Sequence, residues 1–62
     1  MPYVSIRVAG TLTKEQKAKI ASGVTDVLVK EAGKSPESVM IFIDEVAKEN
    51  IAKAGILFDP PA

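Results

Sequence analysis

The clearest candidate for chemistry in this chain is Pro2, which directly follows Met1 and precedes the apolar stretch 3–8. Initiator methionine is normally removed before a residue as small as proline, and its removal leaves Pro2 with a free secondary amine. An N-terminal amine has a pKa near ~8, and burial or a neighbouring positive charge lowers that pKa because both disfavour the ammonium form. An amine tuned to about neutral pH is suited to general base catalysis. The alternative is structural, since proline is tolerated at the first residue of a strand.

The other polar residues give weaker indications of a catalytic role than Pro2 does. The chain contains no His and no Cys, which excludes a catalytic triad, a thiolate nucleophile, a disulfide, a zinc finger and an iron–sulfur cluster. Asp44 and Glu45 are adjacent carboxylates, but neighbours on a strand point to opposite faces, so a solvated strand end is favoured over an acid/base pair. Arg7 is suited to bind a substrate carboxylate or to pair with an acidic residue of a neighbouring chain, and we favour the structural pairing. The lysines are expected on the exterior of a helix: Lys14, Lys17, Lys19 and Lys30.

Length and charge restrict the class of protein. The chain of 62 residues forms one domain, residues 1–62. A chain of this size buries only about 60% of its unfolded surface, so small folds usually need a disulfide, a metal or association. Without cysteine, oligomerisation is the expected means of stabilisation. The formal net charge is zero, and one Tyr and two Phe make no base-stacking platform, which argues against nucleic acid as a partner. No apolar run approaches the ~20 residues of a membrane span and no signal peptide is present, so we expect a soluble, cytoplasmic protein without a membrane partner.

Hydrophobic periodicity predicts a strand followed by a helix. Residues 3–8 alternate apolar and polar positions, as expected for a strand with one covered face. Thr13 and Gln16 form a capping box that starts a helix running to about Ala32, and Gly33 supplies its C-cap. One face of this helix carries apolar residues at helical spacing: Ile20, Ala21, Val24, Val27 and Leu28.

A second strand is predicted over residues 39–43, which are apolar on both sides, as is typical of a strand covered on both faces in a parallel sheet. Strand, helix and strand within about 45 residues indicate one β-α-β unit with parallel strands. A single helix covers only one face of such a sheet, so the other face requires another chain. After a polar loop at 47–50, residues 55–58 predict a small strand or hairpin arm, and the ordered chain is expected to end at 59–61. The predicted class is α/β (α+β).

These residues together resemble the 4-oxalocrotonate tautomerase family over essentially the whole chain. The similarity is carried by Pro2-Tyr3-Val4, by Thr13-Lys14-Glu15-Gln16-Lys17, and by Ser38-Val39 through Ile43-Asp44-Glu45-Val46-Ala47-Lys48. Within the family the chain is most similar to the divergent DmpI-type members. The resemblance implies a β-α-β protomer with a C-terminal hairpin, assembled as a hexamer that is a trimer of dimers. It also implies that Pro2, once exposed, moves a proton between an enol and its unsaturated keto form, with a small unsaturated carboxylic acid as substrate and no metal or cofactor.

The chain departs from the family at its charged positions. Leu12 and Met40 stand where the two substrate-binding arginines of the family are expected, and Ile51 stands where its aromatic pocket residue is expected. Arginines bind carboxylates bidentately and stabilise charge on a dienolate oxygen. We therefore expect a weak tautomerase that acts on a 2-hydroxy-dienoate or an aryl enolpyruvate-type acid. Besides Pro2, the candidate substrate-binding residues are Arg7, Ser38, Met40, Ile51 and Lys53.

Three functions are compatible with this pattern. The first is a weak or altered tautomerase that uses Pro2 as its base. The second is a non-catalytic oligomeric scaffold that has kept the fold and lost the activity. A third, addition or dehalogenation on small unsaturated acids, occurs in the superfamily but needs arginine or carboxylate partners that this sequence does not place.

Overall fold

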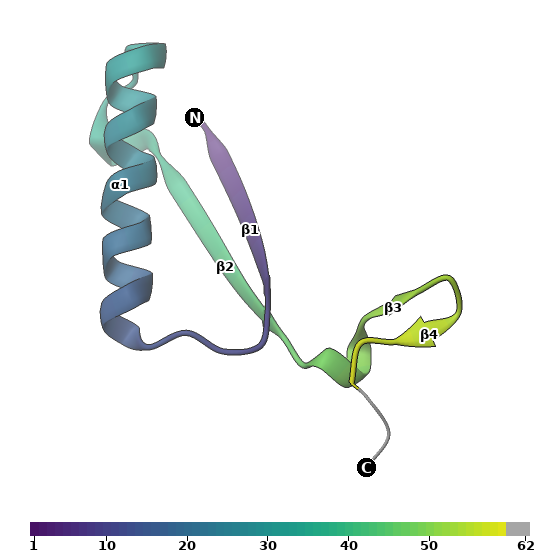
Figure 1. The fold of residues 1–62 in the computed structure, drawn as a ribbon. Coiled ribbons are helices and arrows are strands. Elements are labelled where there is room, and N and C mark those ends of the chain that lie inside the picture. The colour runs from purple at the N-terminus through teal and green to yellow at the C-terminus, as the bar shows by residue number, and fades with distance from the viewer. Residues whose placement is uncertain (60–62) are drawn as a thin grey trace.

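The computed structural model describes residues 1–59 and shows a long helix beside a two-stranded sheet, followed by a separate hairpin (Figure 1). The predicted order of strand, helix, strand and hairpin is confirmed, and of the residues expected to end the ordered chain, 60 and 61 lie outside the described part. The elements are β1 (Tyr3–Ala9), α1 (Lys14–Ala32), β2 (Met40–Val46), β3 (Ala52–Lys53) and β4 (Ile56–Leu57). Short 3-10 turns precede β2 and the hairpin, at Pro36–Ser38 and Lys48–Asn50.

The sheet consists of β1 and β2, which pair in parallel from Tyr3↔Met40 to Ala9↔Val46. One backbone hydrogen bond extends the ladder at each end. The Met40 N–H donates to the Pro2 carbonyl at 3.0 Å, and the Gly10 N–H donates to the Val46 carbonyl at 2.8 Å. The predicted second strand was too short at its carboxyl end, because pairing with β1 holds three further residues in the extended conformation.

Helix α1 begins and ends as the sequence predicts. The Gln16 N–H donates to the Thr13 hydroxyl at 3.1 Å, and the Thr13 N–H donates to the Gln16 side-chain oxygen at 2.9 Å, which completes the capping box. At the other end, Gly33 has φ 64° and its N–H donates to the Leu28 carbonyl. Glycine reaches this left-handed conformation without steric cost, so the chain can leave the helix there.

One residue of the predicted apolar face of α1 is not covered by the sheet. Ile20, Ala21, Val24 and Leu28 are half-buried, whereas Val27 is 57% exposed. Because successive residues turn by about 100° around a helix, Val27 lies roughly 60° from Val24 and falls at the margin of the apolar stripe. Val27 therefore lies on the predicted apolar face but is not covered in the protomer.

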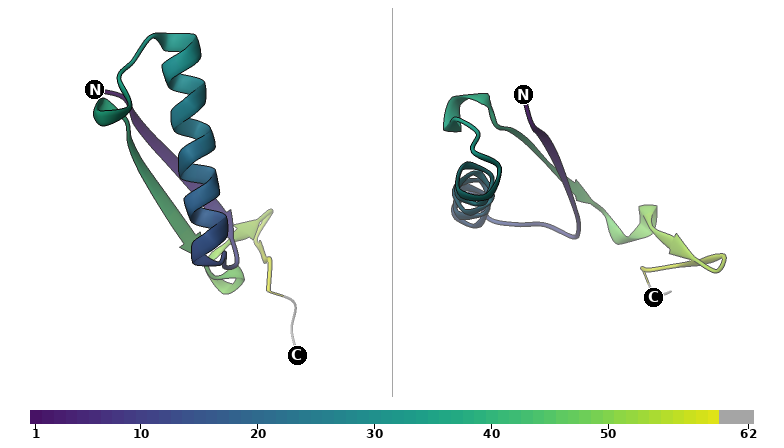
Figure 2. Two further views of the ribbon diagram at one scale, coloured as in Figure 1. Left: turned by 90° about the vertical axis from the view of Figure 1, so that its left-hand side faces the viewer. Right: turned by 90° about the horizontal axis from the view of Figure 1, so that it is seen from above.

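The protomer does not close a hydrophobic core, because α1 covers one face of the sheet and no described element covers the other (Figure 2). Tyr3, Met40 and Phe42 on that second face remain 67%, 44% and 52% exposed. The accessible surface is 4974 Å², against about 3,900 Å² for a typical folded monomer of this mass. The radius of gyration is 15.1 Å, against roughly 10.6 Å for a compact chain of this length.

Within residues 1–59, no helix is long and apolar enough to cross a membrane. The cytoplasmic location and the absence of a nucleic-acid partner stay predictions.

Candidate active site

Pro2 lies at the end of the sheet where β1 begins beside the start of β2. Its carbonyl accepts the Met40 N–H at 3.0 Å, and the next residue, Tyr3, is the register partner of Met40. Pro2 is half-buried, while Met1 in front of it is 73% exposed. The proline ring is therefore fixed by the sheet on its carboxyl side, with its nitrogen joined only to an exposed residue.

Two of the predicted substrate-binding residues, Ser38 and Met40, lie at the same end of the sheet as Pro2, because the turn before β2 ends there. The Ser38 N–H and hydroxyl both donate to the Ser35 carbonyl, at 3.1 and 2.8 Å, and Ser38 precedes Met40 by two residues. Since the proton of the Ser38 hydroxyl is used within the turn, this oxygen is left as an acceptor. The Met40 side chain is exposed on the uncovered face of the sheet. Pro2, Ser38 and Met40 thus lie together at the end of the sheet where β1 and β2 begin.

The remaining predicted site residues lie far from this end of the sheet within one protomer. Arg7 follows Pro2 by five residues along β1, about 17 Å at ~3.3 Å per residue. Ile51 lies beyond the far end of β2, where its carbonyl accepts the Phe58 N–H at 2.8 Å. Lys53 is exposed in β3 opposite Ile56. Figure 1 shows the N-terminus and the hairpin at opposite ends of the molecule, so one protomer does not unite these residues.

Leu12 also lies at the far end, in the loop between β1 and α1. The described residues of a single protomer enclose no pocket. Within that same part of the chain, no three metal-ligating side chains gather into a group. The candidate site of one protomer is accordingly the end of the sheet that carries Pro2, and it is open to solvent.

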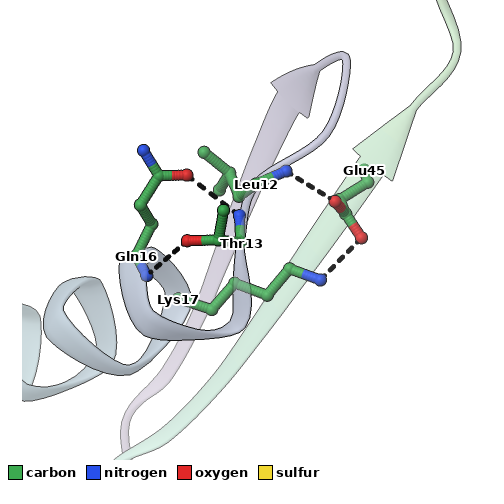
Figure 3. Close-up of polar contacts among 5 residues, drawn as sticks. All are labelled: Leu12, Thr13, Gln16, Lys17 and Glu45. Atoms are coloured by element: carbon green, nitrogen blue, oxygen red, sulfur yellow. Dashed lines mark hydrogen bonds and ion pairs between the residues drawn. The ribbon is translucent and has the colours of Figure 1, made fainter.

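A polar cluster at the far end of the sheet was not expected from the sequence (Figure 3). Glu45 binds with both carboxylate oxygens: the Lys17 ammonium donates to Oε1 and the Leu12 N–H donates to Oε2, each at 2.7 Å. The hydrogen bond from Lys17 is the main cause that lowers the pKa of Glu45 below its ordinary value, and the Leu12 N–H lowers it further. Asp44 and Glu45 are both exposed, as predicted for a strand end, but Glu45 is in addition held by two hydrogen bonds. Lys17, which was expected on the helix exterior, is half-buried and paired with Glu45.

The sequence does contain a signal for this pair. The period of two places Glu45 on the same face of β2 as Ile41 and Ile43, which α1 covers. Helical spacing places Lys17 on the covered stripe of α1 together with Val24. A single negative charge and a single positive charge on two facing apolar surfaces predict an ion pair between them. In the structure this pair holds the loop that contains Leu12 against the end of β2.

The family model for tautomerase enzymes matches residues 2–59 of the chain. The chain belongs to the tautomerase family. This confirms the resemblance found in the sequence, and the matched region begins at Pro2. Because members of this family interconvert tautomers, the protein is an isomerase.

Individual relatives agree with this assignment. The tautomerase resembles the protein named Probable tautomerase K2 of Dickeya dadantii, with 43% identity over 51 residues, 81% of this chain and 76% of the relative. It resembles 2-hydroxymuconate tautomerase of Bacillus subtilis, with 36% identity over 55 residues and 89% of each chain. It also superimposes on the crystal structure of DmpI from Helicobacter pylori with a TM-score of 0.83 and 32% identity, covering 92% of this chain and 90% of the other.

Proposed function

We propose that this tautomerase uses the amine of Pro2 as its general base on a small unsaturated carboxylic acid. The observation that carries the proposal is the placement of Pro2, which is half-buried and fixed to Met40 by a 3.0 Å hydrogen bond at the edge of the sheet. After Met1 is removed, the nitrogen becomes a secondary amine in that same position. Partial burial disfavours its ammonium form and brings its pKa toward neutral pH.

The proposed reaction needs one proton and no external reactant. The neutral amine accepts the proton of the enol form, and the negative charge spreads over the conjugated enolate and its oxygen. The resulting secondary ammonium returns the proton to a carbon of the conjugated chain, which gives the keto form and restores the neutral amine. With Met1 attached, the Pro2 nitrogen is a tertiary amide without a lone pair that is free to accept a proton, so this cycle is blocked.

The test compares two forms of the same chain, one that begins at Pro2 and one that retains Met1. We expect the Pro2 form to convert an enol substrate to its keto form and the Met1 form to be nearly inactive, although both fold alike. Mass spectrometry gives the processed fraction, and the rate should scale with that fraction. Equal rates from the two forms would show that Pro2 is not the base.

The substrate that we propose is a monocarboxylate with an apolar or aromatic tail, such as an aryl enolpyruvate. Leu12, Met40 and Ile51 stand where the family carries charged or aromatic side chains, so a dicarboxylate would leave one carboxylate without a cationic partner. A buried and unpaired charge costs at least several kcal/mol, whereas an apolar tail gains about 25 cal/mol per Å² of area removed from water. We expect kcat/KM to be higher for the aryl monoacid, and weak overall. Equal or faster turnover of the dicarboxylate would contradict this assignment.

The working form that we propose is a hexamer, a trimer of dimers. Its support is the protomer itself, which leaves one face of its sheet open and separates Pro2 from Leu12, Ile51 and Lys53 by the length of the sheet. In an assembly, the end of one copy that carries Leu12, Ile51 and Lys53 can meet the end of another copy that carries Pro2. A folded and stable monomer at micromolar concentration in sedimentation experiments would exclude this arrangement.

A second candidate is a non-catalytic scaffold with the tautomerase fold. The observation that favours it is the pair Leu12 and Met40, which replaces both expected arginines. The two candidates separate in one measurement, because a scaffold that begins at Pro2 would assemble fully yet leave the enol to ketonise at the rate of the buffer alone.

A further inference from the structure

The uncovered face of the β1–β2 sheet carries a charge pattern that its apolar residues do not explain. We call this surface the open face and define it by three residues of each strand: Tyr3, Ser5, Arg7, Met40, Phe42 and Asp44. Alternation along the strands places all six on the side of the sheet away from α1, and all six are exposed. Figure 2 shows the sheet with α1 on one side only.

The exposed surface of the whole chain is large enough to include an interface with another protein. The chain exposes 4974 Å², roughly 1,100 Å² more than a typical monomer of its mass. A stable interface between two proteins buries about 800 Å² on each partner. The excess is therefore sufficient for a specific interface.

The charges of the open face are balanced and adjacent. Arg7 and Asp44 are its one cation and one anion, and they are register partners across the two strands. The ion pairs of the described protomer join Lys17 to Glu45 and Lys19 to Glu15, and neither involves the open face. Tyr3, Met40 and Phe42 occupy one end of the face, and the two charges occupy the other. A surface with an apolar end, one positive charge and one negative charge is complementary to a second copy of itself.

We propose that, where a second copy of this chain covers the open face in the assembly proposed above, Arg7 of each copy forms an ion pair with Asp44 of the neighbouring copy. This inference rests on the assembly proposed above and specifies what orients it. Although Arg7 and Asp44 are neighbours, no ion pair joins them in the described protomer. An apolar partner surface would therefore remove two unpaired charges from water, which is strongly unfavourable. The planar guanidinium binds a carboxylate through two parallel hydrogen bonds, so the pair also selects one orientation of the two copies. Arg7 is in this arrangement a contact between copies rather than a substrate ligand.

The test uses charge reversal in the full chain. Arg7→Asp gives a protomer with two negative charges on the open face, and Asp44→Arg gives one with two positive charges. We expect each variant alone to associate at least tenfold more weakly than the wild type in sedimentation experiments. Asp26→Arg is the matched control, because Asp26 lies exposed on α1 and its reversal should leave association unchanged.

Mixing the two single variants decides between a pair within one chain and a pair between chains. If the ion pair joins two copies, the Arg7→Asp chain complements the Asp44→Arg chain, and the mixture should regain large assemblies that contain both. If the pair lies within one chain, each variant keeps its own repulsion and mixing restores nothing, which would overturn the proposal.

Tautomerase activity measured on the same samples separates this inference from the proposed function. Wild-type chains that assemble without activity would contradict the role of Pro2 and leave the ion pair intact. An Arg7→Asp variant that assembles like the wild type but has a raised KM for a carboxylate substrate would show that Arg7 binds substrate, and the proposal would fail.

Discussion

Replacing Ala54 by glycine should stabilise the hairpin, because Ala54 holds a conformation that suits glycine. Ala54 has φ 53° and Gly55 has φ 80°, so two consecutive residues with positive φ join β3 to β4. This is the requirement of a tight hairpin turn of type I′, in which Asn or Gly is preferred at the first position. The left-handed conformation costs roughly 1–2 kcal/mol for a residue with a Cβ. Glycine removes that cost but gives the unfolded chain more freedom, by about 0.4–1 kcal/mol.

The difference leaves a net gain of about 0.5–1 kcal/mol in the free energy of unfolding per protomer. The matched control is Ala52→Gly, two residues earlier in β3, where the residue is exposed and pairs with Leu57. There the same substitution removes no strain and should destabilise by roughly 0.5–1 kcal/mol. The two variants therefore change composition identically and are expected to shift stability in opposite directions.

Thermal unfolding is the assay, since 1 kcal/mol shifts Tm by about 4–8 °C in a domain of this size. Ala54→Gly should raise Tm and Ala52→Gly should lower it. Hydrogen exchange at the amides of Lys53 and Ile56 reports the same change locally, with slower exchange in the first variant and faster exchange in the second. A lower Tm and faster exchange in Ala54→Gly, or equal shifts in both variants, would refute the argument from backbone strain.

Three further changes test separate parts of the molecule. Gly23→Ala should stabilise α1 by roughly 1 kcal/mol in chemical denaturation, because a Cβ at this position meets no atom within 4 Å in the protomer; destabilisation would place Gly23 against another copy. Glu45 has a lowered pKa in the folded state, so its stabilising contribution is present above the unfolded pKa and is lost as the pH falls through the folded value. Glu45→Gln should accordingly flatten the loss of stability on acidification, and an unchanged pH profile would contradict this. Met40→Arg should raise kcat/KM for a dicarboxylate selectively, with Met40→Leu as the control that adds no charge.

The fold follows from the sequence largely because its signals are local. The capping box at Thr13 and Gln16 and the glycine at position 33 define both ends of α1 without reference to the rest of the chain. Alternation over 3–8 fixes which residues of β1 face the helix. The length of β2 was harder to predict, because Asp44 and Glu45 are poor strand formers and are held extended by pairing with β1. The exposure of Val27 was not predictable, because helical spacing gives the direction of an apolar stripe more accurately than the width that the sheet covers.

The candidate site is less accessible to sequence reasoning. Pro2 and Met40 meet because the strands pair in parallel, and the predicted β-α-β unit already contains that relation. The separation of Pro2 from Ile51 and Lys53 depends on the direction in which the hairpin leaves β2, and no local pattern encodes it. The contact of Glu45 with Lys17 needed the two covered faces to be considered together, since each charge alone is typical of a solvated surface.

Met40 belongs both to the proposed site and to the proposed contact between copies. Its backbone fixes Pro2, while its side chain is exposed on the open face as the register partner of Tyr3. An arginine at this position would strengthen the binding of the second carboxylate of a dicarboxylate substrate. It would also add a charge to the apolar end of the open face. Methionine does the reverse, because it adds apolar area for a contact between copies and leaves the carboxylate unpaired. If the open face is an interface, the Met40→Arg variant should gain dicarboxylate turnover and lose association strength together. A gain in turnover with unchanged association would mean that the Met40 side chain lies beside Pro2 and outside the contact between copies.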